Sequence, residues 1–463
     1  MPARQGAGVV CARKPQLRTE INKSMSKRFA WLFGLGGLVL IGFLVACGQI
    51  YNSQSNGLVI VTSQGSGLLE TYSYDLNGGG NVNGVSNPPE STAEKTCVLN
   101  GFPGQVVIDT AGAYAYAIVT ANSFCGSGSK TGIQAFKINS AGEIANAGGL
   151  VSDPSPIAIS MDTTGKFLFV VEGCLGPSGS TPVAPCLTNP GVLAPYIRSY
   201  AIGSGGSLTF VPASYTLNLP PGFQTPNFVA VAPTPMTLPT SVNGVQTSYC
   251  SGPGNKPPTT EFLYAVDAVN SAVWEFGVNT SSGAITNPPN TTQVQNFVTG
   301  SVPYGVVVEP CNRFVYVTDF QSNQVSGYSI CNGMPTQSPL CPNLPPGSLQ
   351  PIQGSPFTLT TGSGPGPLVA DPFGNNIYVL DTLSNQITPF HIATTSGSLT
   401  SGTVASTGSQ PTWIAIRGDD NWLFVANYNS QTFSEFQITP ATGALSALPT
   451  VTTDNYPYGI AVK

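Results

Sequence analysis

Acidic and amide side chains recur at one place in a repeated sequence pattern, directly after a short apolar segment. The acids are Glu172, Asp267, Asp319 and Asp381, and Asn427 holds the same place in the last full copy. Carboxylate and amide oxygens are the ligands that a hard cation such as Ca²⁺ prefers. A carboxylate whose pKa is raised can instead act as a general base. The pattern defines a candidate ligand or cation site. Its structural alternative is an Asx-type turn, in which each side chain only holds a loop.

Histidine-based catalysis has little support in the sequence. The only histidine, His391, lies in the segment ITPFHI, which we expect to be a third strand far from the centre of the fold. A Ser/His/Asp arrangement cannot be assembled without a central histidine. The chain also has no Cys-x-x-Cys or Cys/His cluster, which argues against zinc. We therefore assign no catalytic residue and no cofactor, with Ca²⁺ at the carboxylates as the one alternative.

Aromatic residues recur near the openings of other apolar segments. They are Trp413, Tyr304, Tyr458 and Phe228. Aromatic rings at the mouth of a channel can stack on sugar rings or cover part of a ligand. The alternative is packing inside the protein. We include Trp413 in the candidate ligand site.

A repeated unit must position these residues. Each copy has a Pro-containing turn, an alternating apolar strand, a short turn, and a second strand that ends in the acid or amide. Clear copies begin at Pro303, Pro365 and Pro411, and looser ones at Pro103, Pro154 and Pro226. The strands are rich in β-branched and aromatic residues. The spacing fits four-stranded propeller blades, some of them with inserted loops.

The two ends of the chain supply a seventh copy. The C-terminal segment PYGIAVK, residues 457–463, is a first strand with nothing after it. Residues 57–76 contain a second and a third strand without a first. Joining the two ends completes one blade and removes free sheet edges. The sequence therefore predicts an all-β, seven-bladed β-propeller over residues 57–463, with the first strand of each blade innermost.

Composition agrees with this fold class. Charged residues make up only 8% of the 463 residues, and the 53 Gly and 41 Pro together make up about a fifth. Helical bundles need charged helix faces and little Gly or Pro. Beyond residue 46 the chain has nine basic and twenty acidic residues, a net charge of −11. Such a body has no basic patch for a phosphate backbone, so we expect no nucleic-acid partner.

The N-terminus resembles an export signal. Lys27 and Arg28 precede an uninterrupted apolar run over residues 29–46, the pattern of a secretory signal. Leu44 to Cys47 resembles the bacterial lipobox, in which the cysteine is lipidated. We predict a signal peptide over residues 1–46, with Met25 as the alternative start, and a lipidated linker over 47–56. The resemblance to Gram-negative lipoproteins favours the outer membrane; an uncleaved membrane anchor is the alternative.

Eight further cysteines remain after Cys47 and the dispensable Cys11. An even number in an exported protein indicates disulfides. Because propeller loops alternate between two faces, we predict four pairs from loop position. The pairs are Cys97–Cys125, Cys174–Cys186, Cys250–Cys311 and Cys331–Cys341, among 105 connectivities that eight cysteines allow.

The strands FVYVTD, IYVLD and LFVAN, the P-x-G-[VI]-x-V segments before them and the S-G-x-[LI] turns resemble one family. It is the lactonase-like seven-bladed propellers, including the 6-phosphogluconolactonase type and the YVTN repeats. The resemblance covers essentially residues 57–463 and implies the propeller fold. Enzymes of this type carry His, Arg and Glu around the channel mouth. The corresponding positions here are Gln105, Pro156, Phe228, Gly305, Pro367, Trp413 and Gly459, and none titrates near neutral pH.

The sequence therefore predicts a lipid-anchored propeller at the cell envelope that acts as a non-catalytic binding or scaffold module. Its expected contacts are the membrane, through the lipid on Cys47, and an envelope protein, a glycan or a small lactone or sugar. Two alternatives stay open. One is a lactone hydrolase with an altered carboxylate site, and the other is a carbohydrate-binding adhesin.

Overall fold

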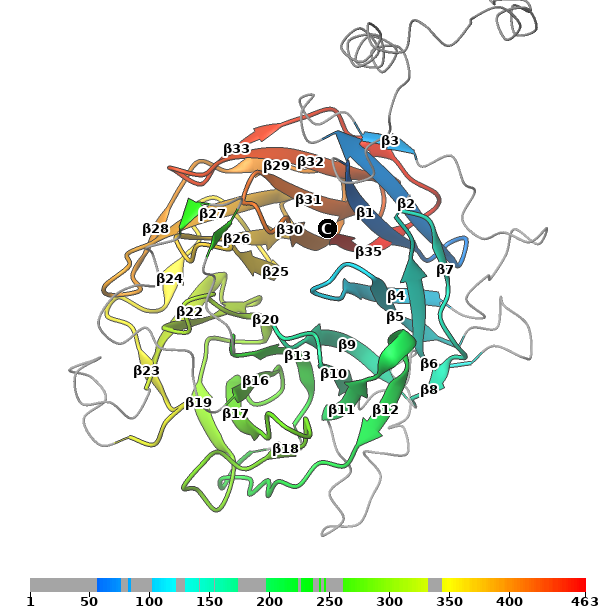
Figure 1. Cartoon of the computed structure of the whole chain (residues 1–463). Helices are drawn as coiled ribbons and strands as arrows, with labels where there is room; N and C mark the ends of the chain where they lie inside the picture. The colour runs from blue at the N-terminus through cyan, green and yellow to red at the C-terminus, as the bar shows by residue number, and fades with distance from the viewer. Residues whose placement is uncertain are drawn as a thin grey trace, which may run out of the picture. The chain divides into compact units, whose positions relative to one another are not determined.

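The computed structural model arranges seven β-sheets in a ring around a central opening (Figure 1). Residues Gln54–Lys463 form one compact unit by their contacts. The all-β, seven-bladed prediction is confirmed. The residues that the structure describes are 56–75, 82–84, 102–121, 130–140, 142–153, 155–173, 197–223, 226–235, 241–242, 245–246, 261–331 and 344–463.

Each blade runs from an innermost strand outward, and the blades follow one another in chain order. Blade 1 is β35 (Pro457–Val462), β1 (Asn56–Ser63), β2 (Leu68–Asp75) and β3 (Val82–Gly84). Blade 2 is β4 (Phe102–Ile108), β5 (Tyr114–Thr120), β6 (Gly132–Ile138), β7 (Ile144–Asn146) and β8 (Val151–Ser152). Blade 3 is β9 (Pro156–Met161), β10 (Phe167–Glu172), β11 (Ile197–Ile202) and β12 (Leu208–Val211), with a 3-10 turn η4 (Ser204–Gly206).

Blade 4 is β13 (Phe228–Pro233), β16 (Glu261–Asp267), β17 (Ala272–Val278), β18 (Ile285–Thr286) and β19 (Gln295–Val298). A separate pair, β14 (Ser241–Val242) and β15 (Val245–Gln246), lies in its insertion. Blade 5 is β20 (Pro303–Val308), β21 (Phe314–Asp319), β22 (Gln324–Ile330), β23 (Leu349–Pro351) and β24 (Phe357–Thr358). Blade 6 is β25 (Pro365–Ala370), β26 (Asn376–Asp381), β27 (Gln386–Ile392), β28 (Leu399–Ser401) and β29 (Ala405–Ser406). Blade 7 is β30 (Pro411–Ile416), β31 (Trp422–Asn427), β32 (Thr432–Thr439), β33 (Ala444–Ala447) and β34 (Val451–Thr452).

Blade 1 closes the ring with strands from both ends of the chain. In β35, Val462 lies opposite Val59 of β1, and Ile460 lies opposite Val61. The C-terminal strand also neighbours β30 of blade 7 and β4 of blade 2. The predicted closure is confirmed, and it leaves no unpaired edge between the first and last blades.

The first strands lie innermost, as the sequence predicts. Each first strand contacts the first strands of both neighbouring blades around the ring, and Figure 1 shows them around the central opening. The second strands are buried along their whole length in blades 3 to 7. Such strands are apolar at nearly every position because a neighbouring blade covers each face.

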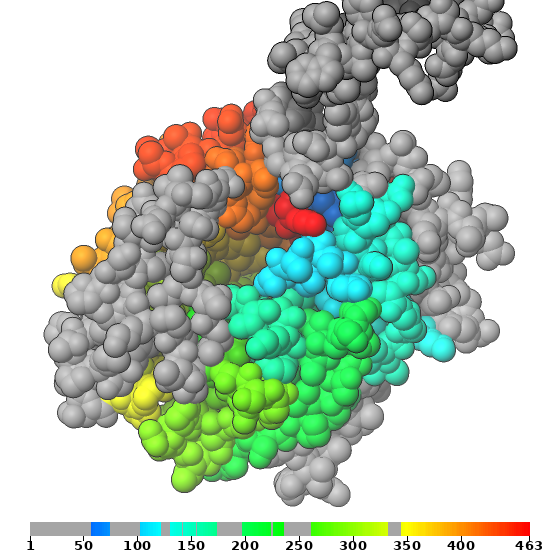
Figure 2. All heavy atoms as spheres, viewed as in Figure 1, coloured from blue at the N-terminus to red at the C-terminus, as the bar shows by residue number. Residues whose placement is uncertain are grey.

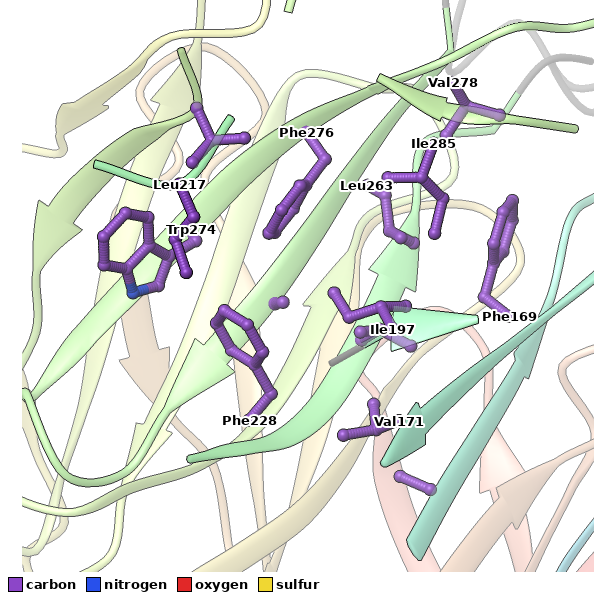
Figure 3. Close-up of a cluster of buried hydrophobic side chains, with 14 of the residues drawn as sticks. Phe169, Val171, Ile197, Leu217, Phe228, Leu263, Trp274, Phe276, Val278 and Ile285 are labelled. Carbon is purple, nitrogen blue, oxygen red and sulfur yellow. The ribbon is translucent and has the colours of Figure 1, made fainter. Parts of the chain in front are cut away.

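Side chains from adjacent blades interdigitate to form the core. Between blades 3 and 4, the rings of Phe228, Trp274 and Phe276 meet edge to face, with centroids 5.9–6.4 Å apart. Figure 3 shows them with Phe169 and Ile197 of the neighbouring blade. Aromatic pairs in this geometry add stability beyond the area that they bury.

The S-G-x-[LI] turns explain how the blades stay in register. Gly397 of blade 6 has φ of 74°, and a Cβ there would lie 2.6 Å from the ring of Phe314 in blade 5. The Tyr316 hydroxyl donates to the Gly397 carbonyl at 2.7 Å. Tyr264 of blade 4 makes the same bond to Gly347 of blade 5 at 2.6 Å. Only glycine combines this backbone conformation with such a close approach.

The ring has two different faces, which we name by their connections. The loop face carries the loops from second to third strands and from each blade to the next first strand. The turn face carries the tight turns from first to second and from third to fourth strands. Among the described residues, no helix is long and apolar enough to cross a membrane.

Candidate functional site

A cavity of about 750 Å³ lies along the first strands at the centre of the ring. Figure 2 shows the ring as hollowed near its centre, beside the cyan segment. The walls come from β4, β9, β13, β20, β25 and β30. Its size is within the range of ligand pockets. At the turn face it ends among Thr163, Pro235, Pro310 and Pro372.

The cavity wall is mostly apolar. Val, Ile, Leu, Ala, Met and Pro side chains dominate it, and Gln105, Ser160 and Thr163 are its polar members besides the indole of Trp413. The Gln105 side-chain oxygen accepts the Ile159 N–H at 2.8 Å, so it joins blade 2 to blade 3. None of the described lining residues ionises near neutral pH.

The acid and amide positions form a ring at the loop face, outside this cavity. Each lies at the end of a second strand, opposite the start of the first strand of its own blade. Asp319 faces Pro303, and Asp381 faces Pro365, for example. The residues of this ring are all buried to 1% exposure or less: Glu172, Asp267, Asp319, Asp381 and Asn427. Of the candidate residues, only Trp413 lines the cavity.

Asp267 holds a loop. Its carboxylate accepts the backbone N–H groups of Val269 and Asn270, and Asn270 Nδ2 donates to it at 2.6 Å. Trp274 Nε1 donates at 3.1 Å from the third strand. This is the Asx-type turn that the sequence offers as the structural alternative.

Asp319 and Asp381 have fewer partners. Ser326 Oγ donates to Asp319 at 2.7 Å, and Thr388 Oγ1 donates to Asp381 at 2.6 Å. The second oxygen, Oδ1, of each acid has no partner among the described residues. Burial raises the pKa of Asp319 to about 7 and that of Asp381 to about 6. These values suit a general base, but neither carboxylate reaches the cavity.

A glycine in each preceding loop sits directly on these side chains. A Cβ at Gly300 would lie 2.6 Å from Asp319, and one at Gly362 would lie 2.2 Å from Asp381. Gly408 donates its N–H to the amide oxygen of Asn427 at 3.1 Å. The three glycines share the sequence Thr-Gly-Ser, at 299–301, 361–363 and 407–409. This repeat is a sequence signal that the acid or amide anchors the loop between blades.

Glu172 lies in a different environment. Arg198 Nε is 2.7 Å from its Oε1, and Asp153 lies near both. Burial raises the pKa of Glu172 to about 9, repulsion from Asp153 adds to this, and Arg198 opposes it. The Tyr200 hydroxyl donates to Asp153 at 2.6 Å. This cluster joins Glu172 and Arg198 of blade 3 to Asp153, which directly follows β8 of blade 2, and it includes no other acid of the ring.

The ring does not bring its carboxylates together. Among the described residues, no group of three or more His, Cys, Asp or Glu side chains could hold a metal ion. The four acids of the ring lie in four different blades, 3 to 6, so they give a cation no shared set of ligands. Ca²⁺ at this ring stays a prediction without further support.

The aromatic candidates separate into three groups. Phe228 is fully buried between blades, so the packing alternative is confirmed for it. Trp413 is partly buried and lines the cavity. Tyr304 and Tyr458 are the second residues of β20 and β35 and lie at the loop face, where Tyr304 is 37% exposed.

The remaining predicted residues add no catalytic group. His391 lies in the third strand β27, away from the cavity, with Nδ1 3.2 Å from the Asn376 side-chain oxygen. Cys311 and Cys331 are both disulfide-bonded. Their predicted partners lie outside the described residues, as do the following cysteines, so the pairing stays a prediction: Cys47, Cys97, Cys125, Cys174, Cys186, Cys250 and Cys341.

Sequence reasoning missed a second set of acids, on the turn face. Asp162 Oδ1 accepts the backbone N–H groups of Lys166 and Phe167, each at 2.7 Å. Glu309 plays the same part in blade 5 and pairs with Arg313 at 3.1 Å. The signal was present in blades 2, 3, 5 and 6 as an acid directly after the first strand, three residues before Gly or Asn.

Comparison with known proteins defines the class. The family described as "Lactonase, 7-bladed beta-propeller" matches residues 255–462. This match, together with the fold, confirms the resemblance to the lactonase-like propellers. No curated protein sequence matches this chain significantly.

Solved structures of similar fold cover almost the whole propeller. A putative 6-phosphogluconolactonase from Bacteroides fragilis is 15% identical, with TM-score 0.58, over 89% of this chain and 99% of that one. The periplasmic gluconolactonase PpgL of Pseudomonas aeruginosa is 16% identical, with TM-score 0.59, over 88% and 98%. A protein from Lactobacillus plantarum is 14% identical, with TM-score 0.60, over 88% and 99%. At these identities the likeness establishes the fold alone.

Proposed function

We propose that this protein is a non-catalytic binding module, displayed at the cell envelope through a lipid on Cys47. The observation that carries the proposal is the wall of the central cavity, whose described residues include no group able to donate or accept a proton near neutral pH. Hydrolysis of a lactone needs a base or a metal-bound water beside the substrate. A binding site needs only shape, apolar surface and a few polar groups.

The buried acids of the loop face support the same proposal. Asp267 is occupied by the loop that it holds, and Asn427 shows that an amide serves at this position. Either group can anchor a loop, because carboxylate and amide oxygens both accept N–H groups. The acids are therefore best explained as anchors for loops that carry the binding surface.

The alternative is a lactonase, because relatives of the same fold are named gluconolactonase and putative 6-phosphogluconolactonase. The raised pKa values of Asp319 and Asp381 favour it. In that case one of these carboxylates would become exposed to a substrate and act as the base.

Titration at constant pH separates the two functions. The purified full chain is mixed with glucono-δ-lactone or 6-phosphogluconolactone, with and without a chelator, and the release of acid is followed. We expect no release above spontaneous hydrolysis. Release that disappears in Asp319→Asn or Asp381→Asn would replace the proposal by a carboxylate-based lactonase, and sensitivity to the chelator would add a metal ion.

The lipid anchor is tested separately. The Cys47→Ser variant should lose incorporation of radiolabelled palmitate and leave the membrane fraction. If the wild-type chain takes up no label and the variant stays in the membrane fraction, the apolar run over residues 29–46 acts as an uncleaved anchor instead. Either result leaves the proposal about the propeller unchanged.

A further inference from the structure

The loop face is almost without charge in the described loops of blades 1 and 4 to 7. They are residues 64–67, 268–271, 299–302, 320–323, 359–364, 382–385, 407–410, 428–431 and 453–456. Asp454 is their one ionisable acid or base besides tyrosine, and its carboxylate accepts the N–H of Asn455. Asn, Gln, Ser, Thr and Gly make up most of the rest. These loops carry little charge with which to select a charged ligand. A ligand that presents hydroxyl and amide groups suits them best.

Aromatic rings are gathered on this face. Tyr428 and Tyr456 are stacked, with centroids 4.9 Å apart and planes inclined by 29°. Tyr304 and Phe320 form a second pair, with centroids 6.2 Å apart and planes inclined by 35°. Tyr458, the second residue of β35, completes the set. We name these five residues the aromatic band.

The band spans the mouth of the channel, because Tyr304 and Tyr458 stand near the start of two first strands that border the central opening. The nearby Tyr458 hydroxyl adds to the burial that raises the pKa of Tyr304. Tyr428 does the same for the pKa of Tyr458. Tyr304 belongs to blade 5 and Tyr458 to blade 1, so the band joins blades that are not neighbours.

The backbone beneath the band is held in one conformation. Gln64 N–H donates to the Tyr456 carbonyl at 2.9 Å, and Tyr428 N–H donates to the Gln410 carbonyl at 2.9 Å. Phe320 N–H donates to the Val302 carbonyl at 3.0 Å. Val302, Gln410 and Tyr456 each precede a proline and have φ of 51–59°. Gly364 precedes Pro365 in blade 6 with φ of 62°, so this left-handed conformation belongs to the entry of four first strands and fixes the loops beneath the band.

Amide side chains flank the aromatic band. Gln321 and Asn429 directly follow Phe320 and Tyr428, and Asn455 precedes Tyr456; all three are exposed. Aromatic faces bordered by amides match the two surfaces of a sugar ring, which has apolar C–H faces and a rim of hydroxyl groups.

We propose that the aromatic band binds a neutral polysaccharide chain along the loop face, with sugar rings stacked on its tyrosines. This inference rests on the proposed binding function and names its ligand class. A protein partner is less well matched, because polar rims of protein interfaces commonly include charged residues, which these loops lack. The hydrogen-bonded backbone reduces the loss of conformational entropy on binding, because the rings are already in position before the ligand arrives.

Calorimetric titration of the full chain with neutral hexasaccharides tests the inference. The probes are β-1,4-linked glucose, α-1,4-linked glucose and β-1,4-linked N-acetylglucosamine. We expect one of them to bind. Tyr456→Ala and Tyr304→Ala should each weaken its binding roughly tenfold, the effect of losing one stacked ring. Tyr456→Phe keeps the ring and should stay within about twofold of the unaltered protein.

Two controls share the exposure of the band but lie outside it. Val298 is 78% exposed at the end of the outer strand β19, and Phe210 is 46% exposed on the outer strand β12. Val298→Ala and Phe210→Ala should leave saccharide binding unchanged. Circular dichroism spectra of all variants establish that each is folded, so a loss of binding reports on the surface.

Three outcomes overturn the inference. Absence of binding to all three probes excludes the ligand class, while the binding module itself would stand as long as lactones are not hydrolysed. Binding that survives both Tyr→Ala changes moves the site elsewhere. A dimer in sedimentation experiments that dissociates in Tyr456→Ala, without saccharide binding, assigns the band to contact with a second copy.

Discussion

The two faces of the propeller use the same residue types in opposite ways. On the turn face, acids hold tight turns and some pair with basic residues, as Glu309 does with Arg313 and Asp419 with Arg417. On the loop face of blades 4 to 7, the acids are buried beneath loops whose exposed side chains are mainly amides, hydroxyls and aromatic rings. Charge on the turn face is used for structure, whereas these loops present an uncharged surface to their surroundings.

This contrast bears on function. Buried acids with raised pKa values are candidates for catalysis only where they meet a cavity and a substrate. Asp162 and Asp267 instead accept backbone N–H groups, and Asp319 and Asp381 accept side-chain hydroxyl groups. The cavity has no described ionisable group. The features left for recognition are the cavity wall and the aromatic band. Both suit binding better than proton transfer.

The largest effect is expected on the turn face. Asp162 is 1% exposed and accepts three backbone N–H groups, from Thr164, Lys166 and Phe167. Asp162→Ala leaves these groups without an acceptor and should lower the free energy of unfolding by about 3 kcal/mol. Urea denaturation followed by tryptophan fluorescence measures the change.

Asp109 is the matched control for that prediction. It accepts the N–H groups of Ala113 and Tyr114 in the equivalent turn of blade 2, but it is partly exposed. Water can replace its bonds, so Asp109→Ala should cost about half as much. Equal losses in both variants would show that burial does not set the strength of these anchors.

The turn glycines come next. Gly397 and Gly205 have nearly the same φ, 74° and 76°, but a Cβ meets Phe314 at the first and nothing within 4 Å at the second. Gly397→Ala should cost about 2–3 kcal/mol, and Gly205→Ala about 1 kcal/mol, the effect of the backbone alone. The difference in denaturation free energy isolates the contact between blades 5 and 6. Similar losses in the two variants would mean that the contact between Gly397 and Phe314 adjusts to an added methyl group with little change in free energy.

Much of the fold could be predicted from the sequence, because it follows from a pattern that repeats. Alternation, turn residues and the incomplete copies at both ends were enough for seven blades and their closure. The prediction for Phe228 also relied on the repeated pattern, and this limited it. Its place near the start of a first strand was correct, but only the structure shows that its ring enters the core against Trp274 and Phe276.

The site was less accessible to sequence reasoning for a physical reason. A pattern shows that Asp319 and Asn427 are equivalent, but not that both face a glycine of a Thr-Gly-Ser loop rather than the cavity. The aromatic band contains residues more than a hundred positions apart, such as Tyr304 and Tyr458, and no local pattern shows that they lie on one face. Their place at the start of two first strands was the one signal available.

The buried acids of the loop face should make the free energy of unfolding depend on pH. Burial raises the pKa of Asp319 to about 7 in the folded state. The unfolded chain releases this proton near pH 4, so wild-type stability should fall as pH rises from about 4 to 7 and be level above. Asp319→Asn removes this part of the slope. At pH 8 it should be more stable than wild type by of order 2 kcal/mol, since the site relaxes around the ionised acid.

Asp381→Asn tests the same effect at a carboxylate whose pKa is raised less than that of Asp319. Burial raises the pKa of Asp381 to about 6, so the gain should be smaller and the slope should end near pH 6. Asn427, hydrogen-bonded to Ser434 and Gly408 in blade 7, shows that the amide fits this position. Denaturation curves between pH 4 and 8 provide the test. A loss of stability in both variants at pH 8 would mean that the ionised carboxylates are needed to hold the loops.

The smallest effect on stability is expected at the aromatic band itself. Tyr456 is 41% exposed, and its ring meets only Tyr428 among the described ring pairs. Tyr456→Ala should change the free energy of unfolding by less than about 1 kcal/mol, because an exposed pair contributes little. A ring that is dispensable for folding, yet exposed beside the mouth of the channel, is best explained by a ligand. If thermal denaturation instead shows a loss as large as that of Gly397→Ala, Tyr456 belongs to the fold, and the contrast between the two faces loses its functional meaning.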